Sequence, residues 1–126
     1  MIKLDYVLLL HKESIEDFGG SLGIRDIGYL QSAIERPFST FGGKELYTSP
    51  FQKAAAILES IVKNHPFVDG NKRTGFLACA SMLLLYDLEL VVEETQSYSF
   101  IIAVASTQMD FENIVEWIQM HSISIV

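Results

Sequence analysis

The sequence is poor in cysteine, which excludes two classes of small protein. Cys79 is the single cysteine among 126 residues, so an internal disulfide framework is impossible and no cysteine-based metal site is encoded. Such a chain suits a reducing cytoplasm. Because 49% of the residues are hydrophobic, a chain of this length can bury a core without cross-links. We therefore expect a single domain over residues 1–126.

The chain also lacks a hydrophobic run long enough to cross a bilayer. The longest apolar stretch, Phe76–Tyr86, is interrupted by Ser81. It is far shorter than the roughly 20 residues that a membrane-spanning helix requires. The first ten residues carry an apolar patch but no small-residue cleavage site, unlike a secretory signal. We expect a cytoplasmic protein with no membrane partner.

Basic residues are scarce as well. Nine Lys and Arg residues stand against sixteen Asp and Glu residues, and the formal net charge is −7. Such a surface repels the phosphate backbone of nucleic acids, so direct binding of DNA or RNA is not expected. Three of the nine basic residues, Lys63, Lys72 and Arg73, nevertheless lie close together. A bound anion would find its positive charge there.

Helix start and stop signals predict an all-α domain of about six helices. Ser49 to Gln52 is the clearest start, because Ser49 can cap, Pro50 suits the first turn and Gln52 can complete a capping box. Pro66 disfavours helical geometry at the residue before it, which ends this helix near Asn64. The caps of the last two helices are expected at Thr95 and Asp110. The expected helices cover residues 5–18, 26–36, 49–64, 71–86, 96–107 and 111–121.

Phe38–Thr48 is the one stretch that we do not expect to be helical. Gly42-Gly43 between short mixed runs suits a tight hairpin turn. The alternation is poor, so a flexible loop fits nearly as well. Its place before the helix that starts at Ser49 could bring it beside the motif discussed next. That motif opens the helix over residues 71–86, which is apolar on almost all sides and should be central and buried.

The stretch best suited to chemistry runs from His65 to Gly75 and reads HPFVDGNKRTG. A loop containing Gly70 leads directly into a helix, whose first N–H groups lack internal partners and carry partial positive charge. Such a helix end accepts phosphate readily. Gly70 permits close approach of the backbone, and Asn71 can pin the loop. Phe67 is expected to turn inward and anchor it.

Lys72 and Arg73 occupy the first turn of that helix, where the helix dipole disfavours each cation by about 0.3–1 kcal/mol. Two cations are explained if an anion shares the site. Arg73 can bind phosphate oxygens in bidentate fashion, while Lys72 acts as a point charge. Lys63, two residues before His65, suits a further phosphate contact.

His65 and Asp69 supply the remaining chemistry. Imidazole changes charge near neutral pH, so His65 is the best available general base for a hydroxyl nucleophile. Asp69 offers a hard oxygen ligand, and Mg²⁺ typically takes one or two carboxylates plus substrate phosphates. Taken singly, these residues would be a loop histidine, a helix cap and a solvated face. Their combination favours a phosphate-handling active site.

HPFVDGNKRTG resembles the active-site motif of the Fic/Doc family, His-x-Phe-x-Asp/Glu-Ala/Gly-Asn-Gly/Lys-Arg, and matches it at all fixed positions. Leu22–Pro37 also resembles the segment that precedes the flap in death-on-curing (Doc) proteins. The resemblance implies a helical bundle with a small β-hairpin flap over Phe38–Thr48. It implies that His65 deprotonates a target hydroxyl and that Asp69 holds magnesium. The phosphates of ATP would be held by Gly70, Asn71, Lys72 and Arg73.

One motif position divides this family. AMP-transferring Fic proteins have glycine where this chain has Lys72, and members with lysine resemble the Doc toxin branch, in which ATP binds reversed and a phosphate is transferred. Gly70 follows the Fic-like option, since the Doc toxin has alanine there. The resemblance implies a toxin that transfers phosphate from ATP to a hydroxyl of a target protein, a translation factor by family likeness. The alternatives are AMP transfer and a catalytically silent module that binds nucleotide or a partner.

The resemblance also implies a partner. The chain contains no Ser/Thr-x-x-x-Glu-Gly/Asn motif of the self-inhibitory kind that some Fic proteins carry. Restraint would therefore come from an antitoxin protein whose segment covers the active-site groove. The flap would align a target segment by strand addition.

Four further residues are expected to have structural roles. Cys79 should be buried in the core and inert. His11 and His121 should be surface or packing residues, because nothing pairs them with His65 at metal-ligand spacing. Trp117 should lie on the inner face of the last helix.

Overall fold

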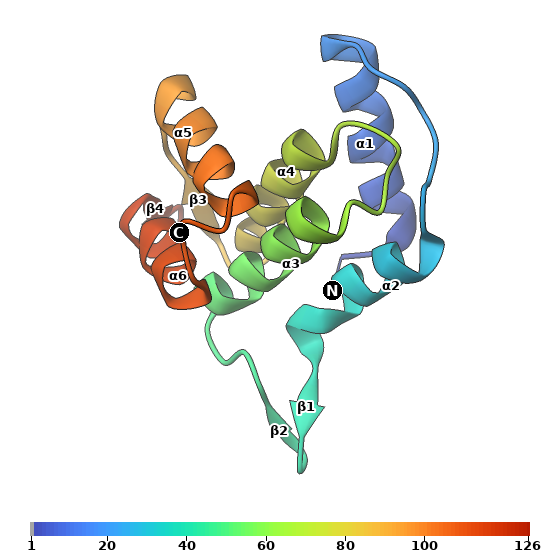
Figure 1. Ribbon diagram of the computed structural model, residues 1–126. Coiled ribbons are helices and arrows are strands. Elements are labelled where there is room, and N and C mark those ends of the chain that lie inside the picture. The colour runs from blue at the N-terminus through green and yellow to red at the C-terminus, as the bar shows by residue number, and fades with distance from the viewer. Residues whose placement is uncertain (1) are drawn as a thin grey trace.

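The computed structural model describes residues 2–126, which form mostly helix (Figure 1). No helix among these residues is both long and apolar enough to span a membrane. The expected all-α bundle is confirmed, with six α-helices and two small strand pairs. The helices are α1 (Leu4–Phe18), α2 (Ile27–Glu35), α3 (Pro50–Asn64), α4 (Asn71–Leu84), α5 (Glu94–Ala105) and α6 (Phe111–Met120), with a short 3-10 helix at Arg36–Phe38. The strands are β1 (Thr40–Phe41), β2 (Lys44–Glu45), β3 (Leu88–Leu90) and β4 (Ser122–Ser124).

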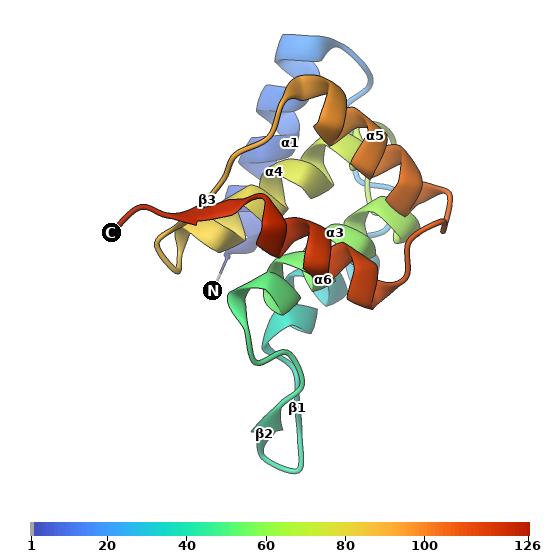
Figure 2. The same cartoon turned by 90° about the vertical axis from the view of Figure 1, so that its left-hand side faces the viewer.

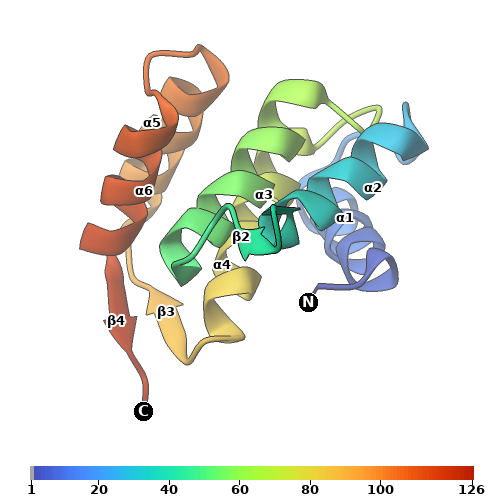
Figure 3. The same cartoon turned by 90° about the horizontal axis from the view of Figure 1, so that it is seen from below.

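The helices are arranged as three adjacent pairs, seen most clearly from below in Figure 3. α3 and α4 form the middle pair, with α1 and α2 on one side and α5 and α6 on the other. The predicted central position of α4 is confirmed, and α3 shares it. Gly75 lets the two central helices approach closely, because a Cβ atom there would lie 2.8 Å from Val62 Cγ2.

α3 begins and ends where the sequence predicts. The Ser49 hydroxyl accepts a hydrogen bond from Gln52 N at 3.1 Å, and the Gln52 side chain accepts one from Ser49 N at 3.0 Å. This is the expected capping box. At the other end, His65 leaves the helix in the left-handed region, with φ 51° and ψ 59°. This conformation of His65 sets the direction in which the loop between α3 and α4 begins.

The segment over Phe38–Thr48 is a hairpin and not a flexible loop. β1 and β2 pair antiparallel, and both turn glycines have positive φ, 59° at Gly42 and 79° at Gly43, as a tight primed turn requires. The hairpin extends from the bundle at the end of α3 that is opposite His65 (Figures 1 and 2). The expected position beside the motif is therefore wrong. The physical reason is that α3, with 15 residues, separates the two by about 22 Å.

Two other details differ from the sequence prediction. Phe38–Thr48 is not the only non-helical stretch, because β3 pairs antiparallel with β4, placing Leu88 opposite Ser124. The predicted helix over residues 71–86 accordingly ends earlier, at Leu84. The fifth helix is capped by Glu93 and not by Thr95. Glu93 and Gln96 form a capping box there, and the helix starts at Glu94.

Candidate active site

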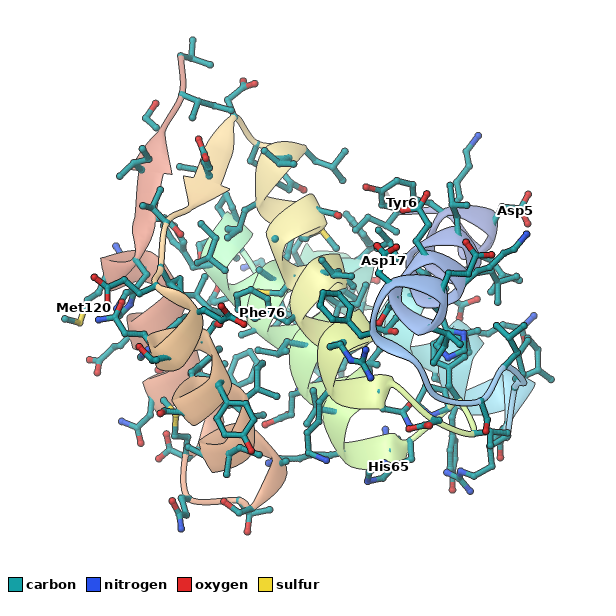
Figure 4. All side chains as sticks on the ribbon, turned by 90° about the horizontal axis from the view of Figure 1, so that it is seen from above. Asp5, Tyr6, Asp17, His65, Phe76 and Met120 are labelled. Atoms are coloured by element: carbon teal, nitrogen blue, oxygen red, sulfur yellow. The ribbon has the colours of Figure 1, made fainter. Side chains whose placement is uncertain are left out.

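A cavity of about 1050 Å³ opens between α4, α5 and the end of α1. Figure 4 shows His65 at the end of α3, beside the loop into α4, and Phe76 on the side of α4 that faces α5. The apolar walls are formed by Phe18, Phe76, Leu77, Tyr98, Ile101 and Ile102. The polar end is formed by His65, Asp69, Gly70, Asn71, Lys72 and Arg73. All of the predicted site residues except Lys63 thus line one cavity.

The loop between α3 and α4 is anchored by Phe67 and Asn71. Phe67 is 1% exposed, as expected for an inward anchor. The side-chain oxygen of Asn71 accepts a hydrogen bond from Phe67 N at 2.9 Å, and its side-chain nitrogen donates one to Phe67 O at 3.0 Å. The predicted pinning of the loop is confirmed. Because the buried Asn71 side chain is engaged in this way, a ligand in the cavity would meet its backbone N–H group.

The start of α4 presents free backbone donors to the cavity. Gly70 is the N-cap with φ 77°, and the first hydrogen bond into the helix runs from Thr74 N to Gly70 O at 3.0 Å. The N–H groups of residues 71–73 precede it and have no helical partner. A Cβ atom at Gly70 would lie 3.1 Å from Ile15 Cδ1, so α1 approaches the loop closely here. This geometry suits an anion.

Asp69 is an exposed carboxylate that backbone donors hold in place. Its oxygens accept hydrogen bonds from Ser21 N at 3.1 Å and from Gly70 N at 2.8 Å. These two bonds, the one from Ser21 first, hold the pKa of Asp69 below its ordinary value of 3.8, with smaller contributions from the charges of Arg73 and His11. The group is therefore ionised at neutral pH. A carboxylate has about four lone-pair sites, so two remain for a further ligand.

Asp69 fits the single protein carboxylate of a magnesium–nucleotide site. Within residues 2–126, no three His, Cys, Asp or Glu side chains gather as a metal cage. Mg²⁺ does not need such a cage, since it is commonly bound through one or two carboxylates, water and substrate phosphates. A single carboxylate such as Asp69 would therefore suit a metal that a phosphorylated substrate also binds.

Lys72 and Arg73 bring two positive charges that no carboxylate neutralises within 4 Å in the described part of the chain. Lys72 is exposed. The Arg73 guanidinium lies 5.1 Å from the centre of the Phe18 ring. It donates two long hydrogen bonds, 3.3 Å to Ser14 O in α1 and 3.4 Å to Gly19 O just after that helix. Bonds of this length are weak, so phosphate oxygens can replace them.

Lys63 does not join the cavity. Its ammonium group lies 3.4 Å from Glu59 Oε2, one turn back along α3. Glu59 also binds Arg36 at 3.0 Å. The predicted phosphate contact of Lys63 is therefore not supported by its position, because the i,i+4 spacing directs its side chain along α3.

Comparisons with known proteins point the same way as this geometry. A model of the Fic/DOC family matches residues 1–83, which include α1 to α3, the motif and most of α4. The chain belongs to the Fic/DOC family. A protein named Toxin Doc from Mycolicibacterium smegmatis is 42% identical over 76 residues, which are 60% of this chain. The match spans 58% of that relative, less than two thirds of its length.

His11 contacts the Fic/DOC motif in a way that sequence reasoning missed. It was expected at the surface or in packing, and it is indeed buried, at 4% exposure. Its ring stacks on Phe67 with 3.8 Å between centroids, and its Nε2 atom lies 2.8 Å from Asp69 O. The available signal was its helical spacing from Val7 and Ile15, which places it on the inner face of α1.

Arg25 is the second residue that sequence reasoning missed. Its guanidinium donates hydrogen bonds to His65 O at 2.6 Å and to Asn64 O at 2.5 Å. The residue lies in the segment before α2, and no local pattern marks it as part of the motif's support. The sequence carried no signal for it beyond the family-like segment Leu22–Pro37.

The remaining predicted structural roles are confirmed. Cys79 is fully buried, and burial raises the pKa of its thiol to about 12, so it is inert. Trp117 stacks on Phe100 with 3.7 Å between centroids. His121 stacks on Trp117 and lies 2.7 Å from its carbonyl oxygen. None of these three residues lines the cavity that holds His65.

Proposed function

We propose that this protein is a Doc-type toxin that transfers a phosphate from ATP to a hydroxyl group of a target protein. The observation that carries the proposal is Lys72, a cation in the first turn of α4 that has no carboxylate partner in residues 2–126 and lines the same cavity as His65. Fic/DOC proteins are generally transferases that act on ATP. A lysine side chain at this turn crowds a phosphate position that backbone alone borders in AMP-transferring members. A reversed nucleotide follows, with its terminal phosphate toward His65.

The proposed roles follow from the geometry of the polar end. The N–H groups at the start of α4 and the Arg73 guanidinium bind the phosphates. Asp69 would hold Mg²⁺, which when bound would neutralise phosphate charge. The target hydroxyl oxygen forms a bond to the γ-phosphorus, its proton passes to His65, and the bond to ADP breaks. His65 is exposed at the cavity, so a protein hydroxyl can reach it.

Two other functions remain as alternatives. Gly70 is the residue of AMP-transferring members, and it favours transfer of an adenylate instead of a phosphate. A silent module that only binds nucleotide or a partner would use the same cavity without needing His65. AMP transfer differs from the main proposal in the group that is transferred. The silent module differs in that removal of the His65 imidazole would have no effect.

We also propose that an antitoxin protein covers the cavity, as the name of the Mycolicibacterium smegmatis relative suggests. Phe18 and Tyr98 are 72% and 70% exposed, and both line the cavity. Apolar side chains of this kind suit the apolar face of an amphipathic helix. The target would be a translation factor by family likeness, and the reaction would take place in the cytoplasm.

Expression in a bacterium without the antitoxin tests the proposal. We expect the wild-type protein to arrest growth and His65→Ala to permit it, because the imidazole is the proposed base. Intact mass measurement of the modified target should then show one added phosphate. An added adenylate would support AMP transfer, and growth arrest that persists in His65→Ala would support the silent module. Lys12→Ala, on the exposed face of α1, is the control and should arrest growth like the wild type.

A further inference from the structure

We propose that Arg25 is the positioning residue that holds His65 in its working orientation. This inference rests on the proposed function, because it assigns a role toward the same base. Arg25 lies before α2, 40 residues from His65 in sequence. It does not line the cavity and so would not touch ATP.

The first observation is the backbone of His65. Its φ of 51° and ψ of 59° lie in the left-handed region, which side chains with a Cβ atom rarely adopt. A residue keeps such a conformation only when its surroundings impose it, and such residues cluster at active sites. Something in the fold must therefore hold this peptide.

The second observation is what holds it. The Arg25 Nε atom donates a hydrogen bond to His65 O at 2.6 Å, and its Nη2 atom donates one to Asn64 O at 2.5 Å. One rigid guanidinium thus binds the last carbonyl of α3 and the carbonyl of the base itself. Two parallel donors fix the relative orientation of these peptide groups, which a single donor cannot do.

Backbone hydrogen bonds from the segment around Arg25 also hold the loop that follows His65. Arg25 N and Asp26 N both donate to Pro66 O, at 2.7 Å and 3.0 Å. Gly23 O accepts a hydrogen bond from Val68 N at 3.0 Å. The segment over residues 23–26 therefore binds the loop on both sides of Phe67. Among the described residues, Arg25 makes this segment's only side-chain hydrogen bond to the His65 peptide.

The charge of Arg25 has no other ionic partner in residues 2–126. No carboxylate lies within 4 Å of it, and its remaining contact is the Tyr29 ring, 5.5 Å from the guanidinium carbon. A cation at the end of α3 also suits the helix dipole. That effect stabilises the helix, whereas the two directed bonds orient His65. The two roles can be separated by comparing variants.

Loss of Arg25 should affect the chemical step and not the binding of ATP. Without the two bonds, the His65 peptide can relax toward negative φ, which turns the imidazole away from the cavity. The phosphate-binding groups at the start of α4 are held separately, by Asn71 and Gly70. An interaction that acts only on the transition state lowers kcat and leaves KM unchanged.

The first experiment measures kcat and KM for ATP in Arg25→Ala, Arg25→Lys and the control Lys12→Ala. We expect Arg25→Ala to lower kcat by about tenfold or more, with KM for ATP within about twofold of wild type. Arg25→Lys should regain only part of the rate, because it keeps the charge but lacks the fork. Lys12→Ala should match the wild type. Unchanged kcat in Arg25→Ala, or full recovery in Arg25→Lys, would overturn the proposal.

The second experiment does not depend on activity. Amide hydrogen exchange reports opening of the loop. We expect protection of the Val68 amide, which is bonded to Gly23 O, to fall by about tenfold in Arg25→Ala, while the Phe67 amide, which is bonded to Asn71, and the amides in α6 keep theirs. Wild-type protection at Val68 would overturn the proposal. If the wild type itself transfers nothing from ATP, the proposed function fails, and exchange still shows whether Arg25 orders the loop. If Arg25→Ala does not fold, Arg25→Lys gives the same comparison.

Discussion

Backbone donors fix the side chain of Asp69 at the polar end of the cavity. The N–H groups of Ser21 and Gly70 both point at its carboxylate, one from the loop after α1 and one from the start of α4. They fix its direction and hold its pKa below the ordinary value. The bond from Ser21 also joins the loop after α1 to the motif, so the site and the local fold depend on each other.

The lowered pKa of Asp69 predicts a pH-dependent contribution to stability. A group whose pKa is depressed in the folded state stabilises the fold above its unfolded pKa, and this stability is lost as pH falls through the folded value. We expect wild type to exceed Asp69→Asn in free energy of unfolding at neutral pH, and the difference to shrink below pH 3.8. Urea unfolding across this range measures it. Asp17→Asn, which removes an exposed carboxylate without hydrogen bonds in the described structure, is the control. A difference independent of pH would contradict the prediction.

At the residue scale, the contiguous motif could be predicted from sequence and its supports could not. The sequence marks His65, Asp69 and residues 70–73 as a site, because a glycine loop, a helix start and two cations occur together there. Arg25 and His11 reach the same loop from 40 and 58 residues away. Only the fold brings them there, and Lys63 shows the converse, since closeness in sequence did not bring it to the cavity.

The contact between α3 and α4 carries the motif, and it depends on Gly75. Glycine in a helix interior normally lowers stability by about 0.5–1 kcal/mol relative to alanine. Here a Cβ atom would meet Val62 Cγ2 at 2.8 Å, with Ile61 and Leu58 atoms at 3.5 Å. The close approach therefore outweighs the helix propensity at this position.

Gly75→Ala should accordingly destabilise the protein, against the usual sign for this substitution. We expect a net loss of about 1–2 kcal/mol in the free energy of unfolding, since overpacking a filled core costs about 1–3 kcal/mol. Urea denaturation measures it. Adding Val62→Ala should make the substitution at Gly75 less costly, because the clashing methyl groups are gone. An increase in stability from Gly75→Ala alone would contradict the account.

At the element scale, helices with explicit caps were predictable and short strands were not. Ser49, Asp26 and Asp110 cap as expected, with side-chain bonds to backbone N–H groups. β3 and β4 have three residues each, too few for a periodic signal, and they pair across more than thirty positions. The hairpin itself followed from Gly42-Gly43, but its distance from His65 is set by the length of α3.

The whole molecule combines an acidic composition with a cavity that has apolar walls and, among the described residues, two cations without carboxylate partners. The net charge of −7 makes the positive polar end distinctive. The composition predicts no nucleic-acid partner, and the motif predicts a nucleotide. The apolar half of the cavity was not predictable, because Phe18, Phe76 and Tyr98 belong to three different helices.

The apolar walls of the cavity predict which substitution would prevent an antitoxin from binding. In co-expression with the antitoxin, Tyr98→Asp should remain toxic whereas the wild type is neutralised, because covering the cavity would bury an unpaired charge. Met120→Asp is the matched control, since Met120 is 80% exposed on α6 and does not line the cavity (Figure 4). Growth of co-expressing cells is the readout. Neutralisation of both variants alike would contradict a binding site in this cavity.

The central claim is that a phosphate, and not an adenylate, leaves ATP at this site. It is tested most directly by incubating the protein with a cell extract and ATP radiolabelled on either the γ- or the α-phosphate. His65→Ala in the same extract gives the background from other kinases. We predict a protein band that is labelled from the γ-position, not from the α-position, and only when His65 is present. Label from the α-position, or identical bands with His65→Ala, would contradict the account.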